Sequence, residues 1–292
     1  MRKQFVSTVS DILKSDKKLV LLLGDIGVFG FKEAFAKFPD RVYNIGILEQ
    51  STIGLASGLA MKGLIPVVHT IAPFIVERSL EQIKDDFGYQ KLGGNFVSLG
   101  ASYDYTSLGC THHCPGDVGI LKNVPEIEII LPGSAQEFDR LFRQAYNDGH
   151  PTYFRLSEKH NSTSQKVIFG QAKVIEKGKS ATVIAVGPML DNVVEAAAGL
   201  DITILYYTTL TPFDDKTLFK NFTGDKVIVC EPYYSGALDY DISEAMKSRK
   251  ISISHIGVPR EFLRNYGSTE DQDKFMKLTV NDIRAKLKTL IK

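Results

Sequence analysis

One glutamate, Glu49, has the best position for acid–base chemistry in this sequence of 292 residues. It follows a short apolar stretch that ends at Ile47 and predicts a β-strand, and it begins a helix expected to run to about Met61. Open α/β folds bind ligands at such strand-to-helix junctions. A glutamate is also common in the first helical turn for purely structural reasons, so the local sequence leaves both interpretations open.

Two cysteines and two histidines lie within five positions, from Cys110 to Cys114. Zinc usually takes its ligands from two separated pairs, and five consecutive residues can hardly surround one ion without strain. We therefore expect no metal ligands from this chain. The only other cysteine is Cys230, and so sparse and odd a set is typical of reduced thiols rather than disulfides.

The helix predicted after Glu49 is unusually rich in small residues, namely Ser51, Gly54, Ala56, Ser57, Gly58 and Ala60. Such residues lower helix propensity but allow another backbone to approach closely. This helix is therefore expected to pack in an interface.

The composition favours small-molecule chemistry. With 35 basic and 34 acidic residues, the chain has no net field that would attract nucleic acid or an anionic membrane. No apolar run approaches the roughly 20 residues of a membrane span, and the polar N-terminal stretch lacks the apolar core of a signal peptide. We expect a cytoplasmic protein that binds neither nucleic acid nor a membrane.

Strands and helices alternate through the first part of the chain. Strands are expected at 18–27, 41–47, 65–70, 95–101, 127–133 and 152–157, and further helices at 6–16, 31–38, 77–92 and 134–148. Continuously apolar strands such as 19–23 belong in parallel sheets covered on both faces. The pattern predicts an α/β fold with a doubly wound, mostly parallel sheet.

A polar stretch separates this region from a second alternation of strands and helices. We predict a first domain at 1–160, a linker at 161–175 and a smaller α/β domain at 176–292.

The segment 46–83 resembles the pyrimidine-binding domain of the transketolase family. The family's G-I-x-E-Q/H element, G-x-x-P turn and phenylalanine-bearing segment correspond to Gly46–Gln50, Gly63–Pro66 and Pro73-Phe74. The segment 108–137 resembles the family's T-H loop with the strand that follows, and the second domain resembles the transketolase C-terminal domain. The resemblance thus covers essentially the whole chain.

This resemblance implies thiamine diphosphate as the cofactor and assigns a role to each matching residue. Glu49 would hydrogen-bond N1′ of the aminopyrimidine and exchange a proton there, which activates C2 of the thiazolium. Phe74 would stack on the pyrimidine, although it could instead be an ordinary core residue. His112 would contact substrate hydroxyl groups and stabilise a developing alkoxide.

Two further residues match less specifically. Asp25 corresponds to an acidic position near the thiazolium, or else caps the loop and helix beyond it. Arg78 would help to bind cofactor or substrate, or else pair with Glu81 or Asp85. The roles of His69, His113, Cys110 and Cys114 stay open.

The sequence lacks the G-D-G motif, with an asparagine about 25 to 30 residues later, through which this family holds the diphosphate and its metal. Its Gly-Asp pairs continue as GDI, GDV and GDK. The resemblance therefore implies a separate subunit that carries this motif and coordinates Mg²⁺. An α2β2 heterotetramer is the expected assembly.

Two departures from the family concern the substrate. Gly100 and Glu158 stand where transketolases carry a histidine and an arginine that grip a sugar phosphate. Arg155 or Lys159 could compensate, although lysine and arginine bind phosphate differently. We expect a weaker dependence on a phosphate terminus.

Three alternatives remain open from sequence. The β subunit of a 2-oxoacid dehydrogenase E1 component shares the glutamate and the split chain, but the T-H-H loop is of transketolase type. Deoxyxylulose-phosphate synthase is normally one longer chain. A non-catalytic subunit of the same fold is the third.

Overall fold

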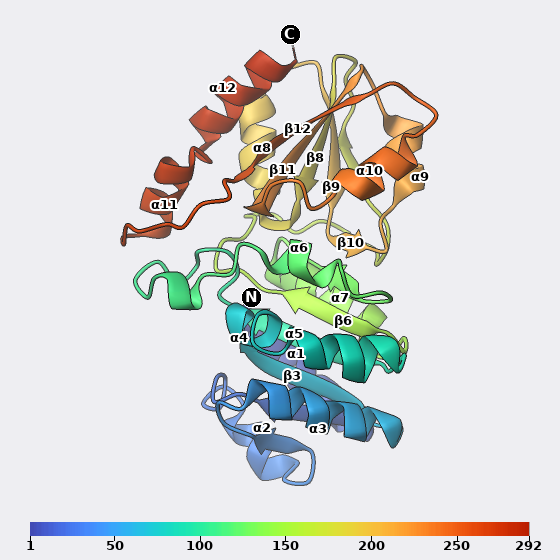
Figure 1. Cartoon of the computed structure of the whole chain (residues 1–292), viewed down its shortest axis with the longest axis vertical. Coiled ribbons are helices and arrows are strands. Elements are labelled where there is room, and N and C mark those ends of the chain that lie inside the picture. The colour runs from blue at the N-terminus through green and yellow to red at the C-terminus, as the bar shows by residue number, and fades with distance from the viewer. Residues whose placement is uncertain (292) are drawn as a thin grey trace.

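Strand β1 (Leu19–Leu23) shows how the apolar sequence determines the architecture, because all five of its side chains are buried. Its odd-numbered leucines join one hydrophobic cluster, and Val20 and Leu22 join another. A strand buried on both faces requires helices on both sides of the sheet. The computed structural model, which describes residues 1–291, contains two such sheets in two stacked α/β units (Figure 1).

The first sheet has seven strands in the order β10-β5-β6-β4-β3-β1-β2. The bounds of the other strands are β2 (Val42–Asn44), β3 (Ile65–Ile71), β4 (Gly94–Leu99), β5 (Glu128–Ile130), β6 (Pro151–Arg155) and β10 (Thr209–Thr211). The neighbours pair in parallel except β10, which is antiparallel to β5. The predicted doubly wound, mostly parallel sheet is confirmed.

Helices cover both faces of this sheet. One face carries α1 (Arg2–Ser15), α2 (Lys32–Lys37) and α7 (Ala135–Ala145), and the other carries α3 (Glu49–Met61), α4 (Ala72–Val76), the π-helix η1 (Ile83–Tyr89) and α6 (Asp117–Leu121). The short α5 (Leu80–Gln82) precedes η1, and the 3₁₀ turn η2 (Cys110–His112) lies in the loop after β4.

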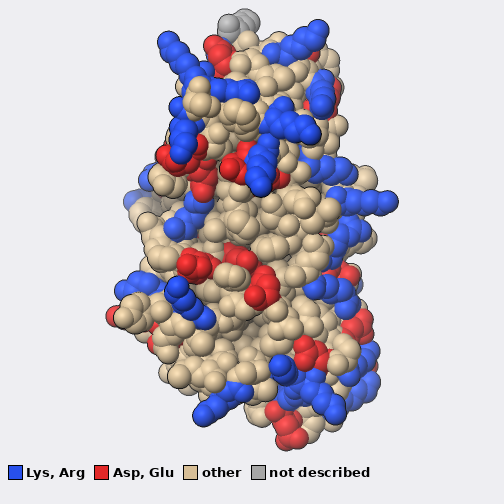
Figure 2. Space-filling model, turned by 90° about the vertical axis from the view of Figure 1, so that its right-hand side faces the viewer, with Lys and Arg blue, Asp and Glu red and all other residues tan. Residues whose placement is uncertain are grey.

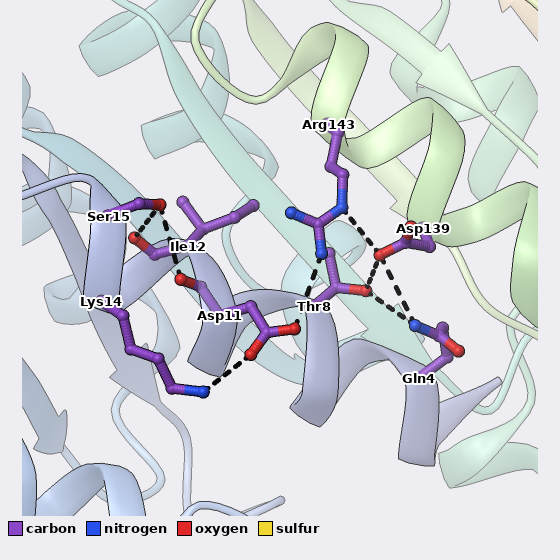
Figure 3. Close-up of polar contacts among 8 residues, drawn as sticks. All are labelled: Gln4, Thr8, Asp11, Ile12, Lys14, Ser15, Asp139 and Arg143. Carbon is purple, nitrogen blue, oxygen red and sulfur yellow. Dashed lines mark hydrogen bonds and ion pairs between the residues drawn. The ribbon is translucent and has the colours of Figure 1, made fainter.

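Polar side chains join α1 to α7 (Figure 3). Thr8 Oγ1 donates to Asp139 Oδ1 at 2.6 Å, and Arg143 Nε donates to the same oxygen at 3.0 Å. Phe5 packs beneath them against Phe138. These contacts fix the N-terminal helix on a segment more than a hundred residues away in sequence.

The second sheet has five strands in the order β12-β11-β8-β9-β7. Their bounds are β7 (Lys173–Glu176), β8 (Thr182–Val186), β9 (Thr203–Tyr207), β11 (Lys226–Tyr234) and β12 (Ser252–Val258). The helices α8 (Leu190–Ala197) and α12 (Val280–Leu290) cover one face, and α9 (Asp215–Asn221) and α10 (Asp239–Ala245) cover the other. The 3₁₀ turn η3 (Gly187–Met189) precedes α8, and α11 (Thr269–Met276) precedes α12.

Three features differ from the sequence-based expectation. The helix expected at 77–92 is shorter, since it runs from Leu80 to Tyr89 as α5 followed by the π-helix η1. Before it, Ser79 Oγ donates to the Ile75 carbonyl at 2.7 Å. Strand β7 begins inside the predicted linker. Strand β10 leaves the second unit and pairs with β5 of the first. The division into 1–160, 161–175 and 176–292 stays a prediction.

Within residues 1–291, no helix is both long and apolar enough to cross a membrane. Figure 2 shows one face of the molecule, on which acidic and basic side chains are interspersed rather than gathered by sign.

Candidate active site

Glu49 is the first residue of α3, and the helix bounds match those predicted from sequence. Its side chain is only 5% exposed. Oε2 accepts a hydrogen bond from Arg78 Nη1 at 3.2 Å, whereas Oε1 is buried without any hydrogen-bond partner in the described structure. One oxygen of the carboxyl group is therefore held, and the other is free to meet a ligand.

Arg78 connects Glu49 to Phe74. Its guanidinium carbon lies 3.6 Å from the centroid of the Phe74 ring, in cation–π geometry. Sequence left pairing with Glu81 or Asp85 open, but the partner is Glu49, and Asp85 instead pairs with Lys84. The guanidinium therefore fixes the carboxyl group and the aromatic ring together.

His112 also packs against Phe74. The two rings meet edge to face with centroids 5.3 Å apart, and His112 meets Tyr105 in the same manner at 5.9 Å. Thr111 Oγ1 lies 2.9 Å from His112 Nδ1. Four of the five residues predicted from sequence thus form one contiguous group, namely Glu49, Arg78, Phe74 and His112.

Asp25 is linked to a different residue. It lies directly after β1 at the same edge of the sheet, is exposed, and adopts the left-handed backbone conformation with φ of 61°. Its N–H donates to Asn44 Oδ1 at 3.0 Å, and Asn44 Nδ2 donates to Asp25 Oδ1 at 3.2 Å. Asp25 does not cap α2, since that helix has Phe31 at its N-cap and no side-chain cap.

His69 is a buried core residue of β3. Nδ1 lies 2.8 Å from the Val97 carbonyl oxygen and so donates to it, which leaves Nε2 unprotonated. Burial lowers the pKa of His69 to about 4. The imidazole is therefore neutral at physiological pH.

The cysteines and histidines of the loop 110–114 have separate surroundings and partners. Cys110 is exposed, whereas Cys114 is buried and its thiol donates to Glu77 Oε1 at 3.6 Å. His113 Nε2 lies 3.2 Å from the Tyr105 carbonyl oxygen, and burial lowers the pKa of His113. Among residues 1–291, no group of three or more His, Cys, Asp or Glu side chains is placed to hold a metal ion.

Arg155 and Lys159, the two candidates to replace a phosphate-binding arginine, both form ion pairs with carboxylates of this chain. Arg155 is buried, donates through Nε to Asp117 Oδ2 at 2.6 Å, and reaches the Pro232 carbonyl through Nη2 at 3.2 Å. Lys159 Nζ pairs with Asp273 at 2.5 Å. Sequence reasoning missed the Arg155–Asp117 pair because its members lie 38 residues apart on β6 and α6.

The residues fit the aminopyrimidine end of thiamine diphosphate. A buried carboxyl oxygen without a partner is costly, and a ring nitrogen of the cofactor would satisfy Glu49 Oε1. Phe74 provides an aromatic surface beside it. The chain contains no G-D-G sequence for the diphosphate end.

Comparison with known proteins places this chain in a family. Residues 1–162 match the transketolase pyrimidine-binding domain, and residues 170–283 match the transketolase C-terminal domain. The chain is 40% identical to an uncharacterized 33.6 kDa protein in the fasciation locus of Rhodococcoides fascians, over 92% of this chain and 88% of that protein. It is 31% identical to an apulose-4-phosphate transketolase subunit of Actinobacillus succinogenes, over 78% of this chain and 76% of that protein.

A solved structure described as a split-gene transketolase, inactive beta4 tetramer, superposes with a TM-score of 0.87 at 25% identity. The match covers 99% of this chain and 97% of that one. The two-unit α/β fold, the matched domains and these relatives agree, and the chain belongs to the transketolase family, whose members generally use thiamine diphosphate.

Proposed function

We propose that this chain is the pyrimidine-binding subunit of a two-component transketolase, which transfers a two-carbon ketol unit between sugars. The observation that carries the proposal is that the two oxygens of the Glu49 carboxyl group have different surroundings. Arg78 holds Oε2, while Oε1 is buried and unpartnered. A carboxyl group in this state is suited to exchange a proton with one nitrogen of a bound ring.

The surrounding side chains support that role. Thiamine diphosphate, when bound, supplies the nucleophilic carbon for the transfer. Arg78 keeps the Glu49 carboxyl group oriented, and Phe74 lies beside it as a flat apolar surface. His112, packed on Phe74, is an N–H donor suited to a substrate oxygen that develops negative charge. Asp25 at the neighbouring strand end is proposed to lie near the thiazolium.

A separate partner subunit is proposed to hold the diphosphate through G-D-G and asparagine, with Mg²⁺ coordinated mainly there. The absence of G-D-G from this sequence supports a divided site. Two relatives support it as well, since one is named as a single subunit of a transketolase and the other is described as a split-gene transketolase in an inactive beta4 tetramer.

Helix α3 is the proposed contact between two copies of this chain in an α2β2 assembly. Its exposed side follows helical spacing through Leu48, Ser51, Leu55 and Gly58, and Leu48 and Leu55 are 56% and 47% exposed. An apolar stripe with small residues suits close helix packing.

Measuring two reactions side by side tests the function. The chain is co-expressed with the reading frame next to its own, provided that this carries G-D-G and a downstream asparagine. Ketol transfer from hydroxypyruvate to an aldose is compared with decarboxylation of a 2-oxoacid followed by acyl transfer. Ketol transfer supports the proposal, and activity in the second reaction alone would assign the chain to the E1 class.

Cofactor binding tests the divided site independently of turnover. Thiamine diphosphate with Mg²⁺ is titrated into this chain alone and into the two-subunit complex. We expect weak binding to the single chain and tight binding to the complex. Tight binding by the single chain would contradict the shared site.

A further inference from the structure

Tyr105 occupies the space in which a side chain at position 100 would lie. Gly100 has φ of 72°, and a β-carbon built on it would overlap the Tyr105 ring and approach Ile71. Because glycine adopts this conformation without strain and leaves that space open, Gly100 allows the ring to lie against the end of β4. The two residues form one structural unit beside the candidate active site.

Tyr105 extends the row of rings that begins next to Glu49. Phe74 lies against Arg78, His112 packs on Phe74, and Tyr105 packs on His112. Tyr105 is therefore placed to contact a substrate whose reacting carbonyl would lie beside His112.

Charges of both signs lie around Tyr105. Burial raises the pKa of the phenol, Arg2 partly offsets this rise, and Glu158 and Asp104 add to it. The hydroxyl group therefore stays protonated and can donate. Asp104 is buried and accepts hydrogen bonds from Ser157 Oγ at 3.0 Å and from the Glu158 N–H at 2.9 Å.

Arg155 and Lys159, the basic residues near Glu158, already form ion pairs. Arg155 pairs with Asp117, and Lys159 pairs with Asp273. Arg2 lowers the pKa of Tyr105, whereas Glu158 and Asp104 raise it, so groups of both signs lie near the phenol. The local chemistry is that of an aromatic surface with a hydroxyl donor and nearby acceptors, which suits hydroxyl groups rather than a phosphate.

We propose that Tyr105 determines the specificity for the acceptor, because its ring and hydroxyl group form the wall against which a neutral, hydroxylated carbon chain lies. An unphosphorylated aldose is then used about as well as its phosphate ester. This inference rests on the ketol transfer proposed above and adds the residue that selects the substrate.

The test uses the two-subunit enzyme, hydroxypyruvate as donor, and the acceptors D-glyceraldehyde and D-glyceraldehyde 3-phosphate, which differ only in the phosphate. We expect kcat/KM for the two acceptors to agree within about tenfold. Tyr105→Ala should lower kcat/KM for glyceraldehyde about fivefold to tenfold, mainly through KM, since one aromatic contact is lost. Tyr105→Phe, which keeps the ring, should lose less.

The exposed Tyr240 on α10 provides the matched control, and Tyr240→Ala should leave both acceptors unaffected. Thermal unfolding of each variant separates a folding defect from a binding defect, and Tyr105→Phe still reports on the hydroxyl group if Tyr105→Ala does not fold.

Three outcomes overturn the inference. A preference for the phosphorylated acceptor of more than about tenfold does so, above all if Arg2→Ala abolishes that preference. The inference is also overturned if both Tyr105 variants keep the wild-type KM and the wild-type ratio of kcat/KM for the two acceptors. Ketol transfer itself would then still support the proposed function. Absence of ketol transfer to either acceptor overturns the proposed function and the inference with it.

Discussion

Arg78 donates a 3.2 Å hydrogen bond to Glu49 and leaves the second oxygen of the same carboxyl group buried without a partner. The guanidinium stacks on Phe74 at the same time. One carboxyl oxygen is therefore fixed, and the other has no protein partner among residues 1–291.

Removing the Arg78 guanidinium should weaken catalysis without unfolding the chain, since this side chain is 43% exposed. We expect Arg78→Met to lower kcat/KM about tenfold or more, because Glu49 loses a charged donor and Phe74 its stacked partner. Arg78→Lys should retain part of the activity but not the planar stacking. The exposed Lys84→Met is the control, and wild-type kinetics in Arg78→Met would contradict the positioning role.

His69 should make the protein less stable in acid. Its folded-state pKa of about 4 lies below the ordinary value of 6.5, so the unfolded chain binds the proton more readily. Stability is therefore lost as the pH falls through 6.5 toward 4, by about 2 kcal/mol at pH 5 from this residue alone.

Urea unfolding of the wild type and of His69→Gln at pH 5 and pH 7 measures this contribution, with the exposed His150→Gln as control. The stability difference between wild type and His69→Gln should shrink at pH 5. An equal difference at both pH values would contradict the assignment.

The buried pair of Arg155 and Asp117 should be structural. Arg155→Met leaves a buried carboxylate unpaired and should cost about 3 to 5 kcal/mol of unfolding free energy. The double variant Asp117→Asn with Arg155→Met should recover part of that loss. Lys159→Met, which breaks a partly exposed pair, should cost about 1 kcal/mol or less. Urea denaturation distinguishes these outcomes, and a neutral Arg155→Met would contradict the role.

The exposed stripe of α3 should control assembly. Leu55→Glu places a charge in the proposed contact between two copies, so the two-subunit complex should sediment as a smaller species while the far-ultraviolet circular dichroism stays unchanged. Ile168→Glu, at a comparably exposed residue away from α3, is the control. An unchanged sedimentation coefficient for Leu55→Glu would exclude α3 from the interface.

The sequence predicted a helix or strand well where the residues within that element determine its structure. The strand ending near Ile47, the junction at Glu49 and the run of small residues predicted α3 with its observed bounds. The apolar runs likewise predicted most strands of both sheets, but not β7, which begins inside the predicted linker, and not β10 as a separate strand. The helix predicted at 77–92 is present but shorter, from Leu80 to Tyr89, and periodicity did not reveal that most of it is a π-helix.

The missed features depend on contacts between distant segments. Strand β10 joins the first sheet only because β5 lies beside it after folding. The partner of Arg78 is Glu49, 29 residues earlier, whereas sequence suggested nearby acids. Arg155 was a candidate for binding phosphate, because the sequence does not predict the path of the loop that brings its buried partner, Asp117, beside it. Spacing along the chain cannot identify such pairs.

The central claim is that Glu49 activates a cofactor held between this chain and its partner. Its most direct test is the rate of hydrogen–deuterium exchange at C2 of thiamine diphosphate bound to the two-subunit complex, for the wild type, Glu49→Gln and the exposed Glu81→Gln. We predict that Glu49→Gln still binds the cofactor but slows exchange about 100-fold or more, and that Glu81→Gln exchanges like the wild type. Equal exchange rates in the wild type and Glu49→Gln would contradict the account.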